Sequence, residues 1–513
     1  MKKAFKKILA LVLILTFVLA VASCGAMSMA PNYGGVYDKM DAMAGMPGVD
    51  NSNEDYTEIV ENPFVDTLEK PDSYFSIDVN TASYPNIRRY IKNGQIHFDK
   101  NAVRVEEMLN YFNYDYNTPT DDSILALTSS VFDTPYNENT KLMTIGLAAK
   151  EIEFEQIENN IVFLIDVSGS MNSPDKLPLV QQAFSLLAEN LNPNDRVSIV
   201  TYASGDKVVL EGAYGYEKDK IIEAINNLKS GGSTAGSKGI NKAYSLAAQY
   251  FIQGGNNRVI LATDGDFNVG VTSTSALEAL IAEKAKTGVY FSVFGFGTGN
   301  IKANLMESLA LKGNGTWGYI DSLKEARRML VEQIGGTLIT VAKDVKAGIT
   351  FNPEYVESYR LVGYENKQLT QDEFEDSKTD AGEIGSGHKV TVVYEVVLTD
   401  RAIIGGENFA DVIIKYKPTE NAGGDAETEQ ELTLSVGVDR YHKNATKNDK
   451  FVASVVEFAL VLRDSKYKGD ASLDAIIERL EALDFGNDED KAEFLQIVKA
   501  YKELYEAYYN KQQ

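Results

Sequence analysis

The sequence predicts an α/β protein whose central domain is a mainly parallel sheet with helices on both faces. Two strand patterns support this prediction. Residues 161–166 form an apolar, largely β-branched run that ends at Asp166, and residues 258–263 form a second run that is followed by Asp264. Such runs are typical of strands buried on both faces. Helical patterns alternate with them, which favours parallel strands joined by helices.

The elements expected in the central domain, residues 158–337, follow this alternation. Strands are predicted over 161–166, 196–202, 207–210, 258–263 and 290–295. Helices are predicted over 176–191, 218–228, 237–251, 274–286 and 323–334. Sheets of this class bind ligands at the carboxyl ends of their strands. Asp166 and Asp264 both lie at such ends, so the topology alone directs attention to them.

Further folded regions are expected on either side of the central domain. Residues 64–117 are predicted to be a small α+β domain, with a strand over 74–79 and helices over 81–90 and 101–112. Its charged residues, Arg88 and Arg89 among them, are interpreted as solvated faces or structural ion pairs. The β-rich segments 118–157 and 338–440 are predicted to form one sandwich, which would make the central domain an insertion.

The C-terminal segment 441–513 is expected to be helical. Apolar and aromatic residues recur there at helical spacing in two stripes. The first stripe is Phe451, Val455, Phe458 and Leu462, and the second is Phe494, Ile497, Val498, Tyr501, Leu504, Tyr505 and Tyr508. Both stripes are predicted to be core rather than binding grooves.

Composition limits the classes of function. The chain has 513 residues, which predicts several domains, and a formal net charge of −24. This acidity argues against binding nucleic acid or lying on an anionic membrane, and it is equally consistent with simple solubility. A single cysteine excludes an intramolecular disulfide and a thiolate metal cluster. The only histidines, His97, His388 and His442, are far apart in sequence, which argues against a zinc cluster or a histidine-based catalytic triad.

The N-terminus has the pattern of a secretion signal. Residues 1–23 combine lysines with an apolar run over 8–22, which is too short for a spanning helix of about 20 residues. The segment 21–24 ends in Cys24 and resembles a lipobox, which implies lipidation of Cys24 and a membrane-anchored, extracytoplasmic lipoprotein of the cell envelope. The alternative is an ordinary signal peptide with a chance cysteine. Residues 24–63 are predicted to be a disordered tether, and removal of the four lysines of the signal leaves the mature chain at −28.

Three short motifs predict a metal site. Asp166, Ser168 and Ser170 follow the first buried strand at every second position, which in extended chain points their side chains to one side. Thr234 lies on a glycine-rich loop, and Asp264 follows the second buried strand. Carboxylate and hydroxyl oxygens are hard donors that suit Mg²⁺ or Mn²⁺.

These motifs together resemble the metal-ion-dependent adhesion site of von Willebrand factor type A domains, which have a Rossmann-like fold. The resemblance implies that Ser168, Ser170 and Thr234 bind the ion directly, and that Asp166 and Asp264 bind it directly or through water. It implies Mg²⁺ or Mn²⁺ rather than Ca²⁺. A vestigial site that folds without metal is the alternative.

The flanking segments also resemble known proteins. Residues 76–84 and 104–112 are similar to the N-terminal domain that accompanies von Willebrand A domains in one group of bacterial envelope lipoproteins. Residues 342–353, 359–366 and 380–388 are similar to the C-terminal domain of the same group.

Three functions remain open at this point. The first is a binding protein that holds a protein or glycan partner through a carboxylate on the ion. The second is an envelope scaffold in which the ion is structural and the flanking domains make the contacts. The third is a Mg²⁺-dependent hydrolase, which is disfavoured because the sequence offers no general base and no phosphate-binding loop. The sequence therefore favours a protein that is not an enzyme and does not bind nucleic acid.

Overall fold

The computed structural model describes residues 53–77, 79–120, 123–154, 157–203, 205–232, 236–265, 273–402, 408–424 and 428–511. The predicted signal 1–23, Cys24 and the tether up to residue 52 lie outside these ranges. Residues 53–63 of the predicted tether lie within the described ranges and contact the rest of the chain. The backbone N–H of Asn53 donates to the carbonyl oxygen of Gly299, and Glu54 forms an ion pair with Arg89 at 2.8 Å. The prediction of a disordered tether is wrong for this stretch, because Arg89 holds Glu54 and the side chain of Asn62 donates to the carbonyl oxygens of Leu361 and Gly363.

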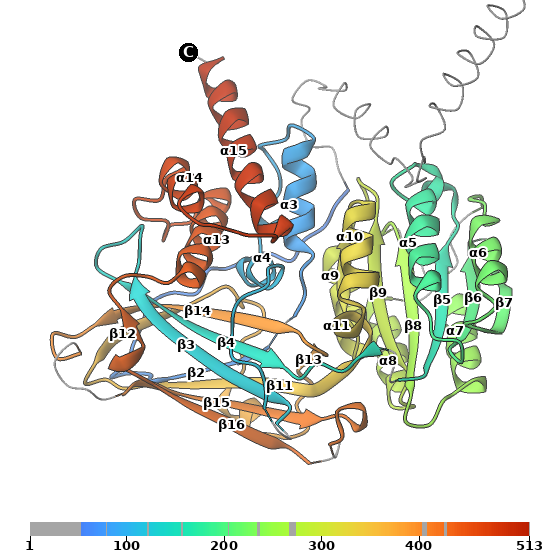
Figure 1. Ribbon diagram of the computed structural model, residues 1–513, viewed down its shortest axis with the longest axis horizontal. Helices are drawn as coiled ribbons and strands as arrows, with labels where there is room; N and C mark the ends of the chain where they lie inside the picture. The colour runs from blue at the N-terminus through green and yellow to red at the C-terminus, as the bar shows by residue number, and fades with distance from the viewer. Residues whose placement is uncertain are drawn as a thin grey trace, which may run out of the picture. The chain divides into compact units, whose positions relative to one another are not determined.

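The central domain contains the predicted mainly parallel sheet (Figure 1). Its strands lie in the order β10-β9-β8-β5-β6-β7, and only β7 pairs antiparallel with its neighbour, β6. The strands are β5 (Asn159–Asp166), β6 (Arg196–Tyr202), β7 (Asp206–Tyr214), β8 (Asn256–Thr263), β9 (Tyr290–Phe296) and β10 (Trp317–Ile320). The predicted fold class is confirmed.

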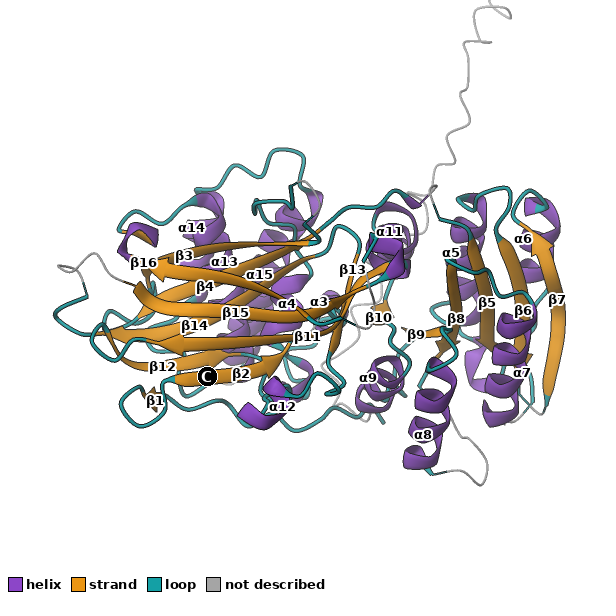
Figure 2. Ribbon diagram, turned by 90° about the horizontal axis from the view of Figure 1, so that it is seen from below, coloured by secondary structure: helices purple, strands orange, loops and turns teal. Residues whose placement is uncertain are grey.

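Helices cover both faces of this sheet (Figure 2). They are α5 (Leu177–Glu189), α6 (Lys218–Asn226), α7 (Gly236–Gln249), α8 (Thr274–Ala285) and α9 (Ala303–Lys312). The strand β5 shows how its sequence serves both faces. Ile161, Phe163 and Ile165 pack in one core with α5 and α6, while Val162 and Leu164 pack in another with α7, α8 and α9. This follows from the two-residue period of a strand.

The end of the central domain differs from the prediction. Helix α9 and strand β10 have no counterpart among the predicted elements, and β10 is only four residues long. The helix expected over 323–334 is divided into α10 (Leu323–Arg327), a π-helical turn (Arg328–Glu332) and α11 (Ile334–Leu338). The N–H of Gln333 donates to the carbonyl oxygen of Arg328, which widens the turn by one residue.

Two further sheets form the predicted sandwich. One has the order β1-β12-β14-β4-β3-β17, and the other has the order β13-β11-β15-β16 with β2 paired to β11. The strands of the first are β1 (Val65–Asp66), β3 (Leu125–Asp133), β4 (Lys141–Ala149), β12 (Val356–Val362), β14 (Lys389–Leu398) and β17 (Tyr441–His442). The strands of the second are β2 (Asp72–Ser76), β11 (Thr340–Phe351), β13 (Gly382–Gly385), β15 (Asn408–Pro418) and β16 (Gln430–Gly437).

The pairing of β4 with β14 joins the segments before and after the central domain. The predicted insertion of that domain into the sandwich is therefore confirmed. The N-terminal strands β1 and β2 also belong to these sheets, since they pair with β12 and β11. The segment 64–117 thus contributes strands to the sandwich instead of forming a sheet of its own.

A helical layer packs on the first of the two sheets. It contains α3 (Ser83–Lys92), α4 (Val105–Asn110), α13 (Lys447–Arg463), α14 (Leu473–Glu481) and α15 (Glu489–Asn510). The helix expected over 101–112 is shorter, because Val103 and Arg104 are extended and the N–H of Arg104 donates to the hydroxyl of Ser83. The first predicted stripe is buried throughout. The second is buried as far as Tyr501, but Tyr505 is 41% exposed, so the core prediction is wrong there.

Candidate metal centre

The loop that follows β5 gathers the first three predicted ligands. Asp166 is fully buried at the end of the strand, and its Oδ1 accepts a hydrogen bond of 2.8 Å from the backbone N–H of Ser168. The hydroxyl oxygens of Ser168 and Ser170 lie 2.9 Å apart. Ser170 belongs to a 3₁₀ turn (Gly169–Asn172) and not to an extended chain as predicted. The turn still places the two hydroxyls side by side.

Strand β8 supplies the fourth predicted ligand. It pairs in parallel with β5, which puts the ends of both strands at one edge of the sheet. The hydroxyl of Thr263 donates to Oδ2 of Asp166 at 3.4 Å, and Asp264 follows as a buried residue. Asp166, Ser168, Ser170 and Asp264 therefore lie together, as the sequence predicts.

The fifth predicted ligand, Thr234, lies outside the described residues. The loop that leads to it is fixed against the first motif. The N–H of Gly231 donates to the carbonyl oxygen of Val167 at 2.8 Å. The N–H of Gly169 donates to the carbonyl oxygen of Gly232 at 3.1 Å. Residues 231–232 are thus attached to the loop that carries both serines.

Burial sets the electrostatics of this edge. Desolvation raises the pKa of Asp166 to about 6, although the backbone N–H of Ser168 favours the ionised form, and the negative charge of Asp264 adds to the rise. Among the described residues, no lysine or arginine forms an ion pair with Asp166. A buried carboxylate without a cationic partner favours either protonation or a bound cation.

Lys176 is the residue of this site that the sequence did not indicate. Its ammonium donates a 2.6 Å hydrogen bond to Oδ2 of Asp264, and both residues are buried. The sequence assigned Lys176 only to the start of a helix. The two residues are 88 positions apart, and a lysine before an amphipathic helix carries no signal of such a contact.

The chemistry of the donors fits a hard divalent ion. The described residues contain no group of three or more histidine, cysteine, aspartate or glutamate side chains that could hold a metal. Among the described residues, the further oxygen donors beside Asp166 include the serine hydroxyls. The Ser168 and Ser170 hydroxyls contact each other beside the buried Asp166 carboxylate, and oxygen donors of this kind suit Mg²⁺ and Mn²⁺.

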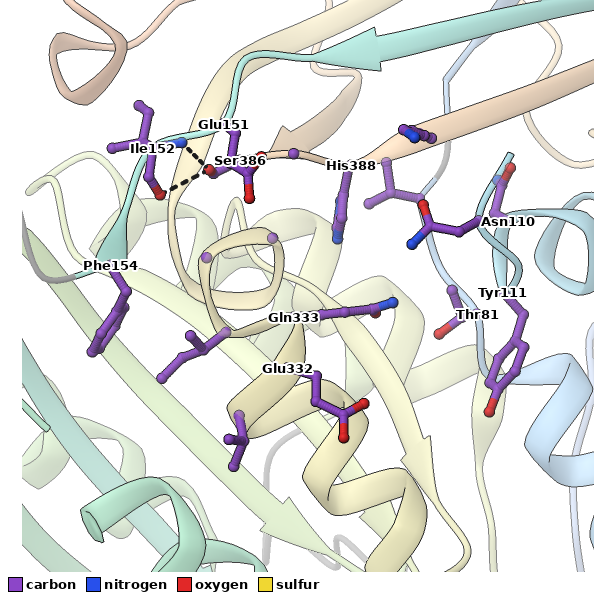
Figure 3. A pocket seen from close by; sticks show the side chains of 18 of the residues that line it. Thr81, Asn110, Tyr111, Glu151, Ile152, Phe154, Glu332, Gln333, Ser386 and His388 are labelled. Carbon is purple, nitrogen blue, oxygen red and sulfur yellow. Dashed lines mark hydrogen bonds between the residues drawn. The ribbon is translucent and has the colours of Figure 1, made fainter. Parts of the chain in front are cut away.

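A separate cavity of about 340 Å³ lies where the chain crosses between the central domain and the sandwich (Figure 3). Residues 151–154 of the first crossing and residues 331–336 of the second both line it. The Ser386 hydroxyl donates to the carbonyl oxygen of Ile152 and accepts from its N–H (Figure 3). Burial, with the charge of Arg328, lowers the pKa of His388 in the cavity wall to about 4, so this imidazole is neutral at pH 7. None of the predicted ligands that the structure describes, Asp166, Ser168, Ser170 and Asp264, lines this cavity.

Comparison with known proteins agrees with the fold. Residues 160–332 match the family model described as "von Willebrand factor type A domain", and residues 50–144 match one described as "von Willebrand factor". Residues 336–504 match a third, described as "Uncharacterized protein YfbK, C-terminal". The central domain is thus a von Willebrand factor type A domain.

Individual relatives narrow this class. The chain is 35% identical over 470 residues to the protein YfbK of Escherichia coli (strain K12), covering 86% of this chain and 80% of the relative. The chain therefore belongs to the YfbK family. It is also 28% identical over 166 residues to the inter-alpha-trypsin inhibitor heavy chain H4 of Homo sapiens, which is 30% of this chain and 17% of that protein.

Solved structures include a von Willebrand factor type A protein from Catenulispora acidiphila. It is 18% identical, with a TM-score of 0.40, over 70% of this chain and 81% of that chain.

Proposed function

We propose that this protein binds a divalent cation, Mg²⁺ or Mn²⁺, at the carboxyl ends of β5 and β8, and that the ion holds a carboxylate of a protein or glycan partner. Ser168, Ser170 and Thr234 would bind the ion directly, and Asp166 and Asp264 would bind it directly or through water. One observation carries the proposal. Asp166 is fully buried, has no cationic partner among the described residues, and lies beside two hydroxyls that contact each other.

The kind of donor suggests the kind of partner. Three of the five proposed ligands are neutral hydroxyls, so the charge of the ion is only partly compensated. An ion in this state favours an anionic ligand at its remaining position, and a carboxylate is such a group that both proteins and acidic glycans carry.

We favour binding over hydrolysis for a chemical reason. The described side chains around Asp166 offer hydroxyls, a second carboxylate and an ammonium, and none is a histidine. His97 stacks edge-on against Tyr508, and His388 lines the separate cavity. A scaffold with a structural ion remains the second candidate, because the sandwich and the helical layer give the chain a large surface outside the central domain.

The experiment compares wild type with Asp166→Asn in thermal unfolding, with Mg²⁺ and with chelator. The wild-type melting temperature is expected to rise with Mg²⁺, since a ligand at 100 times its Kd stabilises the folded state by about 2.7 kcal/mol. The variant is expected to show no rise. Asp195→Asn is a matched control, since Asp195 is equally buried in the same domain and accepts N–H groups from Asn159 and Asn192.

Capture of envelope partners with and without chelator then separates the two candidates. Loss of capture by a folded Asp166→Asn protein supports the proposal. Capture that survives while the response to Mg²⁺ disappears would support the scaffold instead.

We also propose that the protein is a lipoprotein of the cell envelope, anchored through Cys24 with its body outside the cytoplasm. The lysine-rich, apolar and small-residue pattern of residues 1–24 supports this. Within the parts of the chain that the structure describes, no helix is both long and apolar enough to cross a membrane. Cys24→Ser is expected to move the protein from the membrane fraction to the soluble fraction, and a variant that stays with the membrane would contradict the anchor.

A further inference from the structure

Lys176 occupies a constrained position at the proposed metal centre. Its side chain is only 8% exposed, and that of Asp264, to which it donates, is completely buried. Burial of a charged lysine costs folding free energy unless the ammonium is paired with an opposite charge. A pair fixed in this way also interacts electrostatically with any other charge nearby. The position of Lys176 therefore bears on any ion bound beside Asp264.

The backbone holds Lys176 in place from both directions. Its N–H donates to the carbonyl oxygen of Ser173 at 3.0 Å, and its own carbonyl accepts from the N–H of Val180 in the first turn of α5 at 2.9 Å. The lysine is thus fixed at the start of a helix that packs against the central sheet. Its backbone is therefore tied to the first turn of α5.

The side chain is held as well, by the loop that follows β9. Gly297 has a φ of +77°, and a Cβ on this residue would lie 2.3 Å from Cγ of Lys176. Only glycine adopts this backbone readily and leaves room for the lysine stem. The hydroxyl of Tyr319 donates to the carbonyl oxygen of Gly297 at 2.9 Å, which fixes the loop. The ammonium is therefore directed at Asp264.

The charges at this edge are unequal. Among the described residues of the site, Asp166 and Asp264 are acidic and Lys176 is the basic group within reach, paired to Asp264. Asp264 is compensated before any ion binds, whereas Asp166 has no cationic partner in the described part of the chain. A divalent ion bound here would consequently be attracted by the carboxylate of Asp166. It would also be repelled by the ammonium of Lys176, which is fixed to Asp264.

We propose that Lys176 is a built-in counter-cation that weakens the hold of this site on its divalent ion and, in return, strengthens the hold of the ion on an anionic ligand. The inference rests on the proposed cation binding. Repulsion between the ammonium and the ion lowers metal affinity. The same ammonium offsets the charge of Asp264, so the bound ion keeps more of its attraction for an external carboxylate.

The experiment measures Mn²⁺ binding to the full chain by titration calorimetry or electron paramagnetic resonance. For Lys176→Met, the Kd for Mn²⁺ is expected to fall about tenfold, the order expected when a unit charge a few ångströms from a divalent ion is removed. Acetate, titrated into the Mn²⁺-loaded protein and followed by water-proton relaxation, is expected to bind at least about twofold more weakly. The opposite directions of the two changes are the signature of the proposed role.

A matched control removes a lysine elsewhere. Lys367 is 11% exposed and forms an ion pair of 2.7 Å with Glu307, so Lys367→Met makes the same change in net charge at similar burial. It is expected to leave both affinities unchanged. An equal or weaker affinity of Lys176→Met for Mn²⁺ would overturn the inference, since Lys176 would then serve to position Asp264.

The outcomes distinguish this inference from the proposed function. If wild type and Lys176→Met both fail to bind Mn²⁺, both ideas fail. If wild type binds Mn²⁺, Asp166→Asn does not, and Lys176→Met binds no more tightly, only the inference fails. Lys176→Gln guards against a folding defect, because it keeps a hydrogen-bond donor without the charge. If neither variant folds even with Mn²⁺ present, Lys176 is a structural residue and the inference is overturned.

Discussion

Two clusters of buried charge in this protein shift the pKa of a carboxyl group in opposite directions. The junction cluster consists of Arg88, Arg328, Asp321, Glu325 and Glu493, and the strand-end cluster consists of Asp166, Asp264 and Lys176. Burial alone raises the pKa of a carboxyl group in either place. At the junction, the charges of Arg88 and Lys92 overcome burial and hold the pKa of Glu493 at about 2. At the strand ends, the pKa of Asp166 is raised to about 6.

The geometry explains the difference. Arg88 is 1% exposed and donates to Asp321 at 2.5 Å, to Glu325 at 2.9 Å and to Glu493 at 3.0 Å. These partners lie before α10, within α10 and on α15, so one guanidinium joins the N-terminal, central and C-terminal segments. The positive charge of Arg88 is therefore compensated by carboxylates of the protein itself. The strand-end cluster leaves Asp166 uncompensated within the described residues, and hydroxyls gather there.

The comparison indicates how to separate a structural charge cluster from a binding one. A buried cluster whose charges compensate one another stabilises the arrangement of the chain and gains nothing from an external ion. A buried cluster with an excess carboxylate beside neutral hydroxyls gains stability when a cation binds. Variants of the two clusters should therefore differ in whether Mg²⁺ changes their effect.

The largest effect is expected from Arg88→Met. Removal of one partner from a buried ionic network leaves the others without compensation, which typically costs about 3–5 kcal/mol. A large fall in melting temperature is expected, of equal size with Mg²⁺ and with chelator. Differential scanning calorimetry would measure it under both conditions.

An exposed ion pair provides the control for Arg88→Met. Arg401 and Glu354 lie 3.1 Å apart, but their side chains are 75% and 60% exposed. Pairs of this kind contribute about 0–1 kcal/mol, so Arg401→Ala should have almost no effect on the melting temperature. If Arg88→Met and Arg401→Ala lowered the melting temperature equally, burial would not explain why the ion pairs of Arg88 stabilise the fold.

The sequence predicted the strand-end cluster better than the junction. Asp166, Ser168 and Ser170 are close together in the sequence, and Asp264 follows a neighbouring parallel strand, so topology brings the two strand ends together. The predicted extended periodicity is wrong for Ser170, because a 3₁₀ turn places its hydroxyl beside that of Ser168. Arg88 was interpreted as solvated or as part of a structural ion pair. The structure shows that Arg88 forms structural ion pairs, but its partners Asp321 and Glu493 are 233 and 405 residues away in the sequence.

Contacts between distant positions explain the other errors in the same way. Lys176 and Asp264 meet because a positive φ at Gly297 leaves room for the lysine stem, which no local pattern reveals. Residues 53–55 have the composition of a tether, yet Glu54 is fixed by Arg89. Composition reports the average tendency of a segment and does not reveal one strong distant partner.

A smaller effect, dependent on pH, is expected from Glu493→Gln at the junction. The pKa of Glu493 is about 2 in the folded protein and near the ordinary 4.5 when unfolded. The ionised carboxylate therefore stabilises the folded state above about pH 4.5, and this contribution is lost as the pH falls towards 2. The shift corresponds to about 3 kcal/mol at most, because one pKa unit is about 1.4 kcal/mol.

The stability difference between wild type and Glu493→Gln, measured by urea unfolding from pH 7 to pH 3, should be largest at neutral pH and shrink below pH 4.5. Lys92 and Lys324 also contact Glu493, at 2.8 and 3.3 Å, so some ionic stabilisation at the junction is retained in Arg88→Met. The pH dependence in the Arg88→Met background should accordingly be weaker but not absent. A difference that is the same at every pH would mean that the shape of Glu493, and not its charge, holds α15 against α3 and α10.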